Sequence, residues 1–220
     1  MVSVKNIAPP PVRWEEIYRY ARAGEPDAAV RARAEECLAL VQSKLTYRVC
    51  WQEFPLSIMG DEVDAGFATV TSASLARRLE GCHRVMVFAA TVGLDVDRLL
   101  ARYGRTSPAA ALWLDAIGTE RVESLCDAFC EEWEREVAAD GLHATRRFSP
   151  GYGDLPLELQ RDVFRVLEPS RRIGLTLNES LLMSPSKSVT ALVGLGCEKV
   201  TRGEPCTACS KADCTYRRTP

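Results

Sequence analysis

The sequence predicts an α+β fold, and three observations lead to this class. Hydrophobic residues make up 46% of the 220-residue chain, which is enough for a sizeable core. Segments with helical periodicity and short runs rich in β-branched residues follow one another irregularly, whereas a parallel sheet requires regular strand–helix alternation. No glycine-rich loop of the nucleotide-binding kind joins a predicted strand to a predicted helix. The last observation argues against a Rossmann methyltransferase and against a nucleotide hydrolase.

The charge balance and the apolar stretches exclude several classes of partner. The 28 basic and 30 acidic residues give a formal net charge of −2, without the basic excess that is typical of a nucleic-acid-binding protein. The longest strongly apolar stretches, such as residues 85–92, are too short to cross a bilayer. Residues 1–12 lack the apolar centre of a signal peptide. We therefore expect a cytoplasmic protein that binds neither nucleic acid nor a membrane.

The chain is expected to have three parts. Residues 1–12 form an N-terminal arm, in which Pro9, Pro10 and Pro11 prevent regular structure. Residues 13–196 form the α+β domain, and residues 197–220 form a cysteine-rich C-terminal tail. The sequence contains no internal repeat and no low-complexity segment.

In the first half of the domain, start and stop signals set the element boundaries. Asp27 is placed to cap a helix whose apolar residues recur at three- and four-residue steps as far as Leu45. Ser72 is placed to cap a helix that ends before Gly81. The other predicted helices cover residues 14–23 and 93–103, and the predicted strands cover residues 49–58, 63–70 and 84–92.

The longest predicted helix covers residues 108–139, with Ser107 as its N-cap and Pro108 as its first residue. Its buried stripe is predicted to consist of Leu114, Ile117, Val122, Leu125, Phe129 and Trp133. Residues 142–150 follow as a strand that leads into a glycine- and proline-rich turn. A helix over residues 156–167 and a final strand over residues 188–195 complete the domain.

The segment from Arg147 to Tyr152 is a constrained turn that could hold an amino-acid-like ligand. Pro150 fixes one backbone angle, and Gly151 permits angles or close approaches that a side chain would block. Arg147 offers a rigid fork of donors suited to a carboxylate, and Tyr152 offers a phenol that can stack and hydrogen-bond. The alternative is a purely structural turn with an exposed arginine and a packing tyrosine.

Two separated blocks place this turn in a family context. The first block has the pattern Arg-x-x-x-Gly-Tyr at residues 147–152, and the second, residues 177–190, reads Leu-Asn-Glu-Ser-Leu-Leu-Met-Ser-Pro-Ser-Lys-Ser-Val-Thr. They resemble, without internal gaps, the segments Arg-Pro-Ala-Pro-Gly-Tyr and Leu-Thr-Glu-Ser-x-x-Met-x-Pro-x-x-Ser-Val of the activation domain of cobalamin-dependent methionine synthase. The resemblance covers about half the chain, and residues 1–105 carry little of it. It implies long helices packed on a twisted, mainly antiparallel sheet.

The resemblance also implies a site for S-adenosylmethionine (AdoMet). The family uses the arginine and the tyrosine of the first block, which correspond to Arg147 and Tyr152, and the backbone at Pro150 and Gly151 would approach the adenosine. Residues 125–131, Leu-Cys-Asp-Ala-Phe-Cys-Glu, resemble the family's Leu-Ala-Glu-Ala-Phe-Ala-Glu, which places Asp127 at a functional acidic position, as aspartate where the family has glutamate. For another family acid, near the start of the domain, no matching residue is assigned in this sequence.

The second block is expected to support the site or to face a partner protein. The residues in question are Glu179, Ser180, Pro185 and Ser188. The alternative is that this block only forms a turn and the entry to the final strand.

The function implied by the resemblance is the reactivation of methionine synthase, in methionine biosynthesis. The chain would bind AdoMet and support the reductive methylation of cob(II)alamin on a partner, either a cobalamin-binding methionine synthase or another corrinoid protein. An electron donor such as flavodoxin or ferredoxin would supply the electron, so the activity would be an accessory one of the methyltransferase class. Two alternatives remain open: an iron–sulfur or zinc-bearing electron-transfer protein for a corrinoid protein, and a non-catalytic module that senses AdoMet.

Nine cysteines fall into two groups. Five lie in apolar or helical sequence and are expected to pack in the core as small hydrophobic residues. Cys197, Cys206, Cys209 and Cys214 are spaced C-x8-C-x2-C-x4-C in the tail, a pattern that suggests a metal site. An iron–sulfur cluster, a zinc ion and plain reduced cysteines are all compatible with the spacing.

Overall fold

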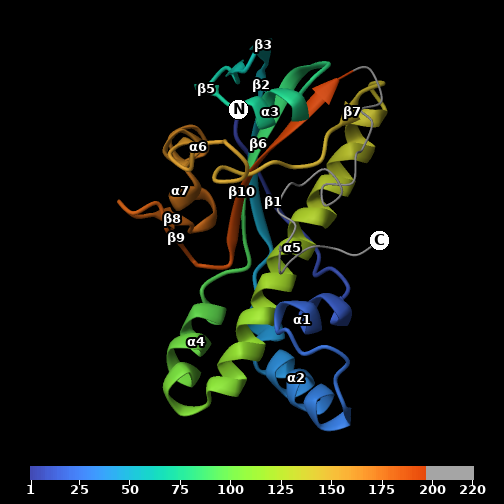
Figure 1. Ribbon diagram of the computed structural model, residues 1–220, viewed down its shortest axis with the longest axis vertical. Helices are drawn as coiled ribbons and strands as arrows, with labels where there is room; N and C mark the ends of the chain where they lie inside the picture. The colour runs from blue at the N-terminus through green and yellow to red at the C-terminus, as the bar shows by residue number, and fades with distance from the viewer. Residues whose placement is uncertain (197–220) are drawn as a thin grey trace.

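A five-stranded antiparallel sheet lies at the centre of the computed structural model, which describes residues 1–196 (Figure 1). Every strand pair in this sheet is antiparallel. In spatial order the strands are β1 (Ser3–Asn6), β2 (Arg48–Pro55), β6 (Cys82–Thr91), β10 (Ser188–Gly196) and β7 (His143–Ala144). The predicted α+β class, with long helices on a mainly antiparallel sheet, is confirmed.

Strand β6 shows how the sequence builds two cores on this sheet. Successive side chains of a strand point to opposite faces, so the alternate residues of β6 separate into two sets. Met86, Phe88 and Ala90 belong to one buried cluster. Val85, Val87 and Ala89 belong to the other. An apolar run without polar interruption is therefore required, because both faces of the strand are covered.

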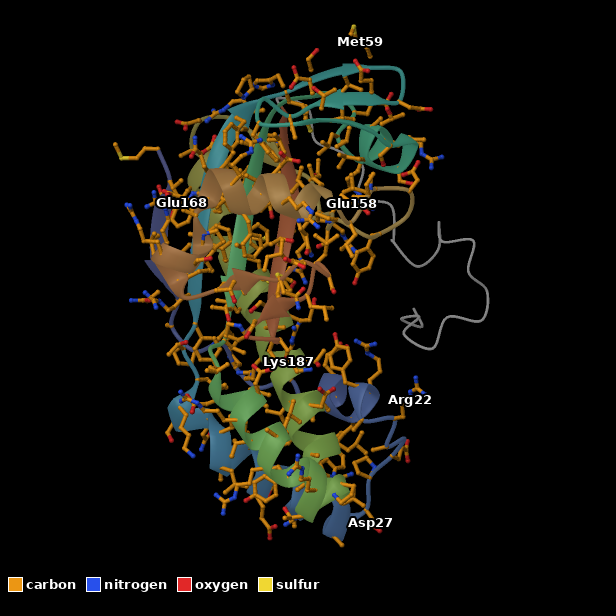
Figure 2. All side chains as sticks on the ribbon, turned by 90° about the vertical axis from the view of Figure 1, so that its left-hand side faces the viewer. Arg22, Asp27, Met59, Glu158, Glu168 and Lys187 are labelled. Carbon is orange, nitrogen blue, oxygen red and sulfur yellow. The ribbon has the colours of Figure 1, made fainter. Side chains whose placement is uncertain are left out.

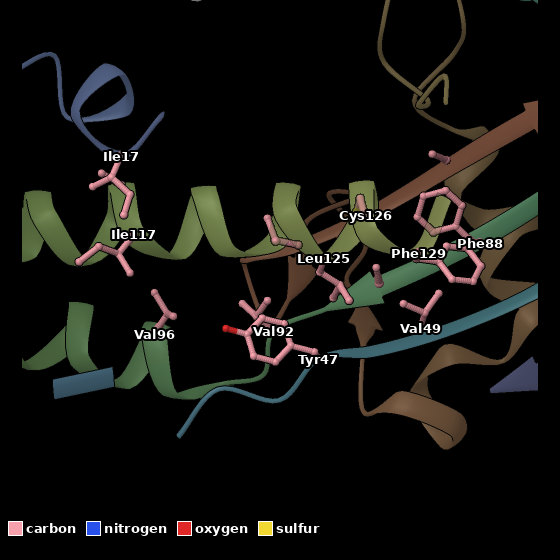
Figure 3. Close-up of a cluster of buried hydrophobic side chains, with 14 of the residues drawn as sticks. Ile17, Tyr47, Val49, Phe88, Val92, Val96, Ile117, Leu125, Cys126 and Phe129 are labelled. Atoms are coloured by element: carbon pink, nitrogen blue, oxygen red, sulfur yellow. The ribbon is translucent and has the colours of Figure 1, made fainter. Parts of the chain in front are cut away.

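One face of the sheet is covered by the long helix α5, which runs diagonally across it in Figure 1. Figure 3 shows Phe129 of α5 beside Phe88 of β6, and their ring centroids are 5.3 Å apart. The six residues predicted for the buried stripe of this helix are all buried. The helical elements on this side are α1 (Trp14–Tyr20), α2 (Ala28–Val41), the short 3-10 turn η1 (Gln42–Lys44), α4 (Asp95–Thr106) and α5 (Pro108–Ala138).

The other face carries shorter elements. The helices are α3 (Ala73–Arg78), α6 (Leu159–Leu167) and α7 (Pro169–Ile173). A small sheet consists of β3 (Ser57–Met59), β4 (Glu62–Asp64) and β5 (Thr69–Thr71), and a separate hairpin of β8 (Thr176–Leu177) and β9 (Met183–Ser184). Figure 2 places Met59 of the small sheet at one end of the long axis and Asp27, before α2, at the other.

All three predicted N-cap residues lie at the N-caps of their helices, and two of them also cap through the side chain. The Asp27 carboxylate accepts a hydrogen bond from the Val30 backbone N–H at 2.8 Å, and the Ser72 hydroxyl accepts one from Leu75 at 3.1 Å. Pro108 is the first residue of α5, as predicted, but the Ser107 side chain makes no capping hydrogen bond. A hydrogen bond of 3.5 Å from Arg33 reaches the Ser107 hydroxyl instead.

The predicted strand over residues 142–150 is much shorter in the structure. Only His143–Ala144 forms β7, followed by an isolated bridge between Phe148 and Leu192. The hydroxyl of Thr145 accepts the Gly194 backbone N–H at 2.9 Å, where a longer strand would use a main-chain carbonyl. The ladder is interrupted there, which releases the chain into the turn that contains Arg147.

Other elements also differ from the prediction: the predicted strand 63–70 is divided into β4 and β5, and the helix predicted to reach Leu45 ends at Val41. Residues 3–6 form the edge strand β1, which the sequence did not predict. The predicted strand 49–58 is divided, because Pro55 has no N–H to continue the ladder and the chain enters the small sheet. Helix α6 begins at Leu159, three residues after the predicted start. In residues 1–196 no helix is both long enough and apolar enough to cross a membrane.

Candidate functional site

Helix α5 carries four polar residues spaced four apart, namely Asp115, Thr119, Glu123 and Asp127. Residues at this spacing lie on the same side of a helix, one turn after another. We call these four residues the polar row. Both sequence blocks that resemble the methionine synthase domain contact this row, although they are about thirty residues apart in the chain.

The second block contacts the first half of the polar row. Lys187 donates hydrogen bonds from Nζ to Asp115 at 2.7 Å and to Thr119 at 2.9 Å. Figure 2 shows Lys187 midway along the molecule, where the turn before β10 meets the helices. The neighbouring Ser186 donates its backbone N–H to Asp97 of α4 at 3.1 Å. This turn is therefore fixed to both α4 and α5.

The first block contacts the second half of the polar row through Arg147. Its guanidinium donates from Nη2 to Glu123 Oε2 at 2.6 Å and from Nη1 to Asp127 Oδ1. About a fifth of the Arg147 side chain is exposed, and about a third of each carboxylate side chain. Arg147 and Asp127, which the sequence assigned separately to the ligand, are thus paired with each other.

The charges of this cluster stabilise one another. Burial lowers the pKa of Arg147, but the Cys126 thiol and the Glu123 and Asp127 carboxylates raise it by more. Burial likewise raises the pKa of Asp127, but Arg147 and Arg13 outweigh that effect and the pKa is lowered. The pair between Arg147 and Asp127 is therefore ionic at neutral pH.

The N-terminal arm supplies a second guanidinium. Arg13 donates from Nη1 to the other oxygen of Asp127, at 2.7 Å, so that both oxygens of this carboxylate accept from arginines. Arg13 also donates its backbone N–H to the fully buried Glu120 at 3.2 Å. Arg121, likewise buried, donates to the carbonyl oxygens of Pro10 and Pro11 at 2.7 Å each. The proline segment predicted as an arm is fixed against α5 by these contacts.

The turn after Arg147 has a backbone that requires glycine. Pro150 is buried, and Gly151 has a φ of 88°, a conformation that residues with a side chain rarely adopt. A Cβ atom on Gly151 would also lie 3.2 Å from the Leu157 side chain. The Gly151 N–H donates to the Leu155 carbonyl oxygen at 2.9 Å, which closes the turn and presents Tyr152 at its tip.

Tyr152 is 67% exposed, yet its phenol is coupled to the cluster on α5. Partial burial raises the pKa of Tyr152, the charge of Glu123 raises it further, and Arg147 opposes both. Burial and the charge of Glu123 also raise the pKa of Tyr20, on α1. Glu123 thus lies within electrostatic range of a tyrosine from the turn and of a tyrosine from the N-terminal helix.

A surface hollow of about 460 Å³ adjoins Arg13 and is lined by residues 12–16. Its volume falls in the range of small-molecule sites, which is roughly 300–1,000 Å³. Trp14 and Tyr18 stack next to it, with ring centroids 5.9 Å apart. Aromatic and charged groups are therefore both available where the arm meets α5.

The expected support residues of the second block separate into two pairs. Glu179 and Ser180 are exposed, beyond the hairpin strand β8. Pro185 and Ser188 are buried, and the Ser188 hydroxyl donates to the Pro185 carbonyl oxygen and contacts the Thr91 hydroxyl at 2.8 Å. The buried pair has the position of structural support, and the exposed pair is accessible to a partner.

The cysteines of the tail, Cys197, Cys206, Cys209 and Cys214, lie outside the described residues. Within residues 1–196, no group of three or more His, Cys, Asp or Glu residues could hold a metal ion. Of the other five cysteines, Cys37, Cys50 and Cys126 are buried, as predicted for core packing, and Cys82 and Cys130 are partly buried. Burial raises the pKa of Cys50 to about 12 and that of Cys130 to about 11, so these thiols stay protonated at neutral pH.

Sequence reasoning missed several residues of this cluster, namely Arg13, Glu120, Arg121 and Glu123. Glu123 could have been found, because it precedes Asp127 by four residues on a predicted helix and so lies on the same face. Arg13 could not have been found in this way, since nothing in the local pattern shows that the arm returns to α5.

Comparisons with known proteins bear on the fold. No protein-family model matches the chain, and no curated protein matches it in sequence. Among solved structures, the chain is similar to the crystal structure of the MetH reactivation domain bound to AdoHcy, the demethylated product of AdoMet. The TM-score is 0.59 at 15% sequence identity, over 88% of this chain and 78% of that one. The structure therefore has the fold of that reactivation domain, which confirms the resemblance predicted from the two blocks.

Proposed function

We propose that this chain binds AdoMet and AdoHcy at the polar row of α5 and supports the reductive methylation of cob(II)alamin held by a partner protein. One observation carries the proposal: two motif blocks, distant in the chain, both place a cation on the same row of one helix. The likeness in fold to a reactivation domain solved with AdoHcy supports it.

The residues present fit the amino-acid part of such a ligand. Arg147 has a planar fork that can form two parallel hydrogen bonds to a carboxylate. It is partly exposed, so a ligand can reach it. Tyr152, at the tip of the turn, can pack on the ligand, and the positive φ of Gly151 lets the backbone approach closely. The hollow beside Arg13 offers additional volume.

The chemistry of methyl transfer resides in the ligand and not in the chain. AdoMet supplies a sulfonium-bound methyl group to a cobalt nucleophile on the partner. What the chain contributes is orientation: Arg147 and Tyr152 hold the ligand on a rigid helix, which lowers the entropic part of the barrier. The expected partners are a cobalamin-binding methionine synthase or another corrinoid protein, with flavodoxin or ferredoxin as electron donor. A metal or a cluster at the tail cysteines, and a cytoplasmic location, stay predictions.

Calorimetric titration with AdoHcy tests the proposed binding. Wild-type protein is expected to bind, and Arg147→Ala to bind at least about tenfold more weakly, because a charge-assisted contact is lost. Arg33→Ala is the matched control, since it removes the same charge from an exposed pair with Glu36 on α2. Absence of binding by the folded wild-type protein would overturn the proposal.

The second half of the proposal requires its own assay. The chain is mixed with a cobalamin-bearing partner, a reductant and AdoMet, and the formation of methylcobalamin is followed by its absorbance. Methylation that depends on this chain and is lost in Arg147→Ala is expected. Binding without any methylation would instead indicate a module that senses AdoMet.

A further inference from the structure

Two ion pairs share the second half of the polar row, and they are held in different ways. One joins Arg13 to Asp127 and the other joins Arg147 to Glu123. Arg147 connects them, because it also contacts Asp127. A ligand that carries both a carboxylate and an ammonium group must open one of these pairs.

The pair between Arg13 and Asp127 is fixed from several directions. Arg13 is bound to the buried Glu120 by its backbone N–H at 3.2 Å and by its Nε at 3.4 Å. Just before Arg13 in the chain, the carbonyl oxygens of Pro10 and Pro11 accept hydrogen bonds from the buried Arg121. Moving Arg13 would require this buried network to separate, which leaves charges without partners in the core. Both oxygens of Asp127 are already engaged by arginines.

The pair between Arg147 and Glu123 has no such support. Glu123 accepts from Arg147 through Oε2 at 2.6 Å, and within residues 1–196 no other hydrogen bond to its carboxylate is found. Its side chain is 30% exposed. It is electrostatically coupled to Tyr20 on one element and to Tyr152 on another. In the second half of the row, Glu123 is therefore the carboxylate that a ligand can reach without disturbing the core.

We propose that Glu123 is a specificity-determining residue that receives the ammonium group of an α-amino-acid ligand while Arg147 receives its carboxylate. A zwitterion then replaces one internal ion pair by two new ones, and the net charge of the site does not change. Asp127 stays paired with Arg13 and does not bind the ligand, so Arg13 acts as a positioning residue. The inference rests on the proposed function and names the carboxylate that selects the ligand.

The test compares AdoHcy with its analogue that lacks only the α-amino group. Calorimetry on the full chain is expected to show that wild type prefers AdoHcy by about 10- to 100-fold. In Glu123→Gln, which keeps the shape and removes the charge, this preference falls to within about threefold. In Asp127→Asn both ligands bind more weakly, but the preference remains. Glu123→Asp, with a shorter carboxylate, is expected to retain part of it.

The outcomes separate this inference from the proposed function. If wild type binds neither ligand, the proposed function is overturned and this inference falls with it. If wild type binds and the amino-group preference survives in Glu123→Gln, or is lost in Asp127→Asn instead, only the role of Glu123 is overturned. Arg33→Ala should show the wild-type preference, and thermal unfolding of each variant confirms that it is folded.

Discussion

Two charged clusters lie one helical turn apart on α5 and differ mainly in their exposure. Glu120 and Arg121 are adjacent, paired at 2.6 Å, and practically inaccessible to water. Glu123 and Asp127 are paired with Arg147, and about a third of each carboxylate side chain is exposed. Both clusters use the same chemistry on the same helix.

The difference shows how one helix can serve stability and binding together. In the buried cluster Glu120 also accepts from Ser124 at 2.5 Å, and Arg121 donates to the arm, so the donors and acceptors satisfy one another. Removing either Glu120 or Arg121 leaves a buried charge without its ionic partner, which is costly. In the exposed cluster water can solvate a group that leaves its partner, so the pairs can exchange with a ligand.

The largest expected effect is on stability, in Glu120→Ala. The substitution leaves the buried Arg121 without its carboxylate and removes an acceptor for Arg13 and Ser124. We expect the free energy of unfolding to fall by about 3 to 5 kcal/mol. Denaturation in urea measures this loss, and Glu36→Ala, in an exposed pair, should show no resolvable change. A loss below about 1 kcal/mol would mean that the buried cluster does not differ from a surface pair.

A smaller loss is expected in Arg147→Ala, where the same measurement tests the exposed cluster. Glu123 and Asp127 lose a partner, but both reach water and Asp127 keeps Arg13. The free energy of unfolding should fall by about 1 to 2 kcal/mol. This variant therefore folds and can be used in the binding assay. A loss equal to that of Glu120→Ala would contradict the distinction between the two clusters.

The sequence predicted those parts of the molecule in which local chemistry decides the structure. Asp27 and Ser72 cap their helices as expected, because a cap depends on neighbours two or three residues away. The buried stripe of α5 followed from helical periodicity, because its apolar residues recur on one face. The two motif blocks also lead to the correct fold and to the turn that contains Arg147.

The remaining features depend on contacts that are distant in the chain. Strand β1 exists because residues 3–6 pair with β2, more than forty positions later. Arg13 meets Asp127 across 114 positions of sequence. Neither contact has a local pattern, so the N-terminal arm was predicted as irregular and its arginine was overlooked. The part of the candidate site that comes from the arm could be found only in three dimensions.

Asp154 is more exposed than the carboxylates of either cluster, and its contribution to the stability of the fold depends on pH. Asp154, in the loop after Tyr152, accepts from the Ser72 hydroxyl at 2.5 Å and from the backbone N–H groups of Ala73 and Ser74. The Ser72 hydroxyl and these donors at Ser74 and Ala73 lower the pKa of Asp154 to about 2. In the unfolded chain the pKa of this carboxyl group is about 3.9, so the folded protein binds the proton less tightly. Asp154 therefore stabilises the fold above about pH 4, and this stability is lost as the pH falls toward the folded value.

The variant Asp154→Asn, which cannot ionise, is expected to unfold at a lower temperature than wild type, by an amount that stays constant from about pH 7 to about pH 5. As the pH falls from about 4 toward about 2, the two unfolding temperatures should converge, because wild type takes up the proton and loses the same charge. Asp127, whose pKa is also lowered, changes both proteins equally and cancels in the difference. A difference that is independent of pH would show that the Asp154 carboxylate acts only through its shape. Convergence would show that its charge fixes the Tyr152 loop to α3, even though the residue is exposed and makes no ion pair in the described part of the chain.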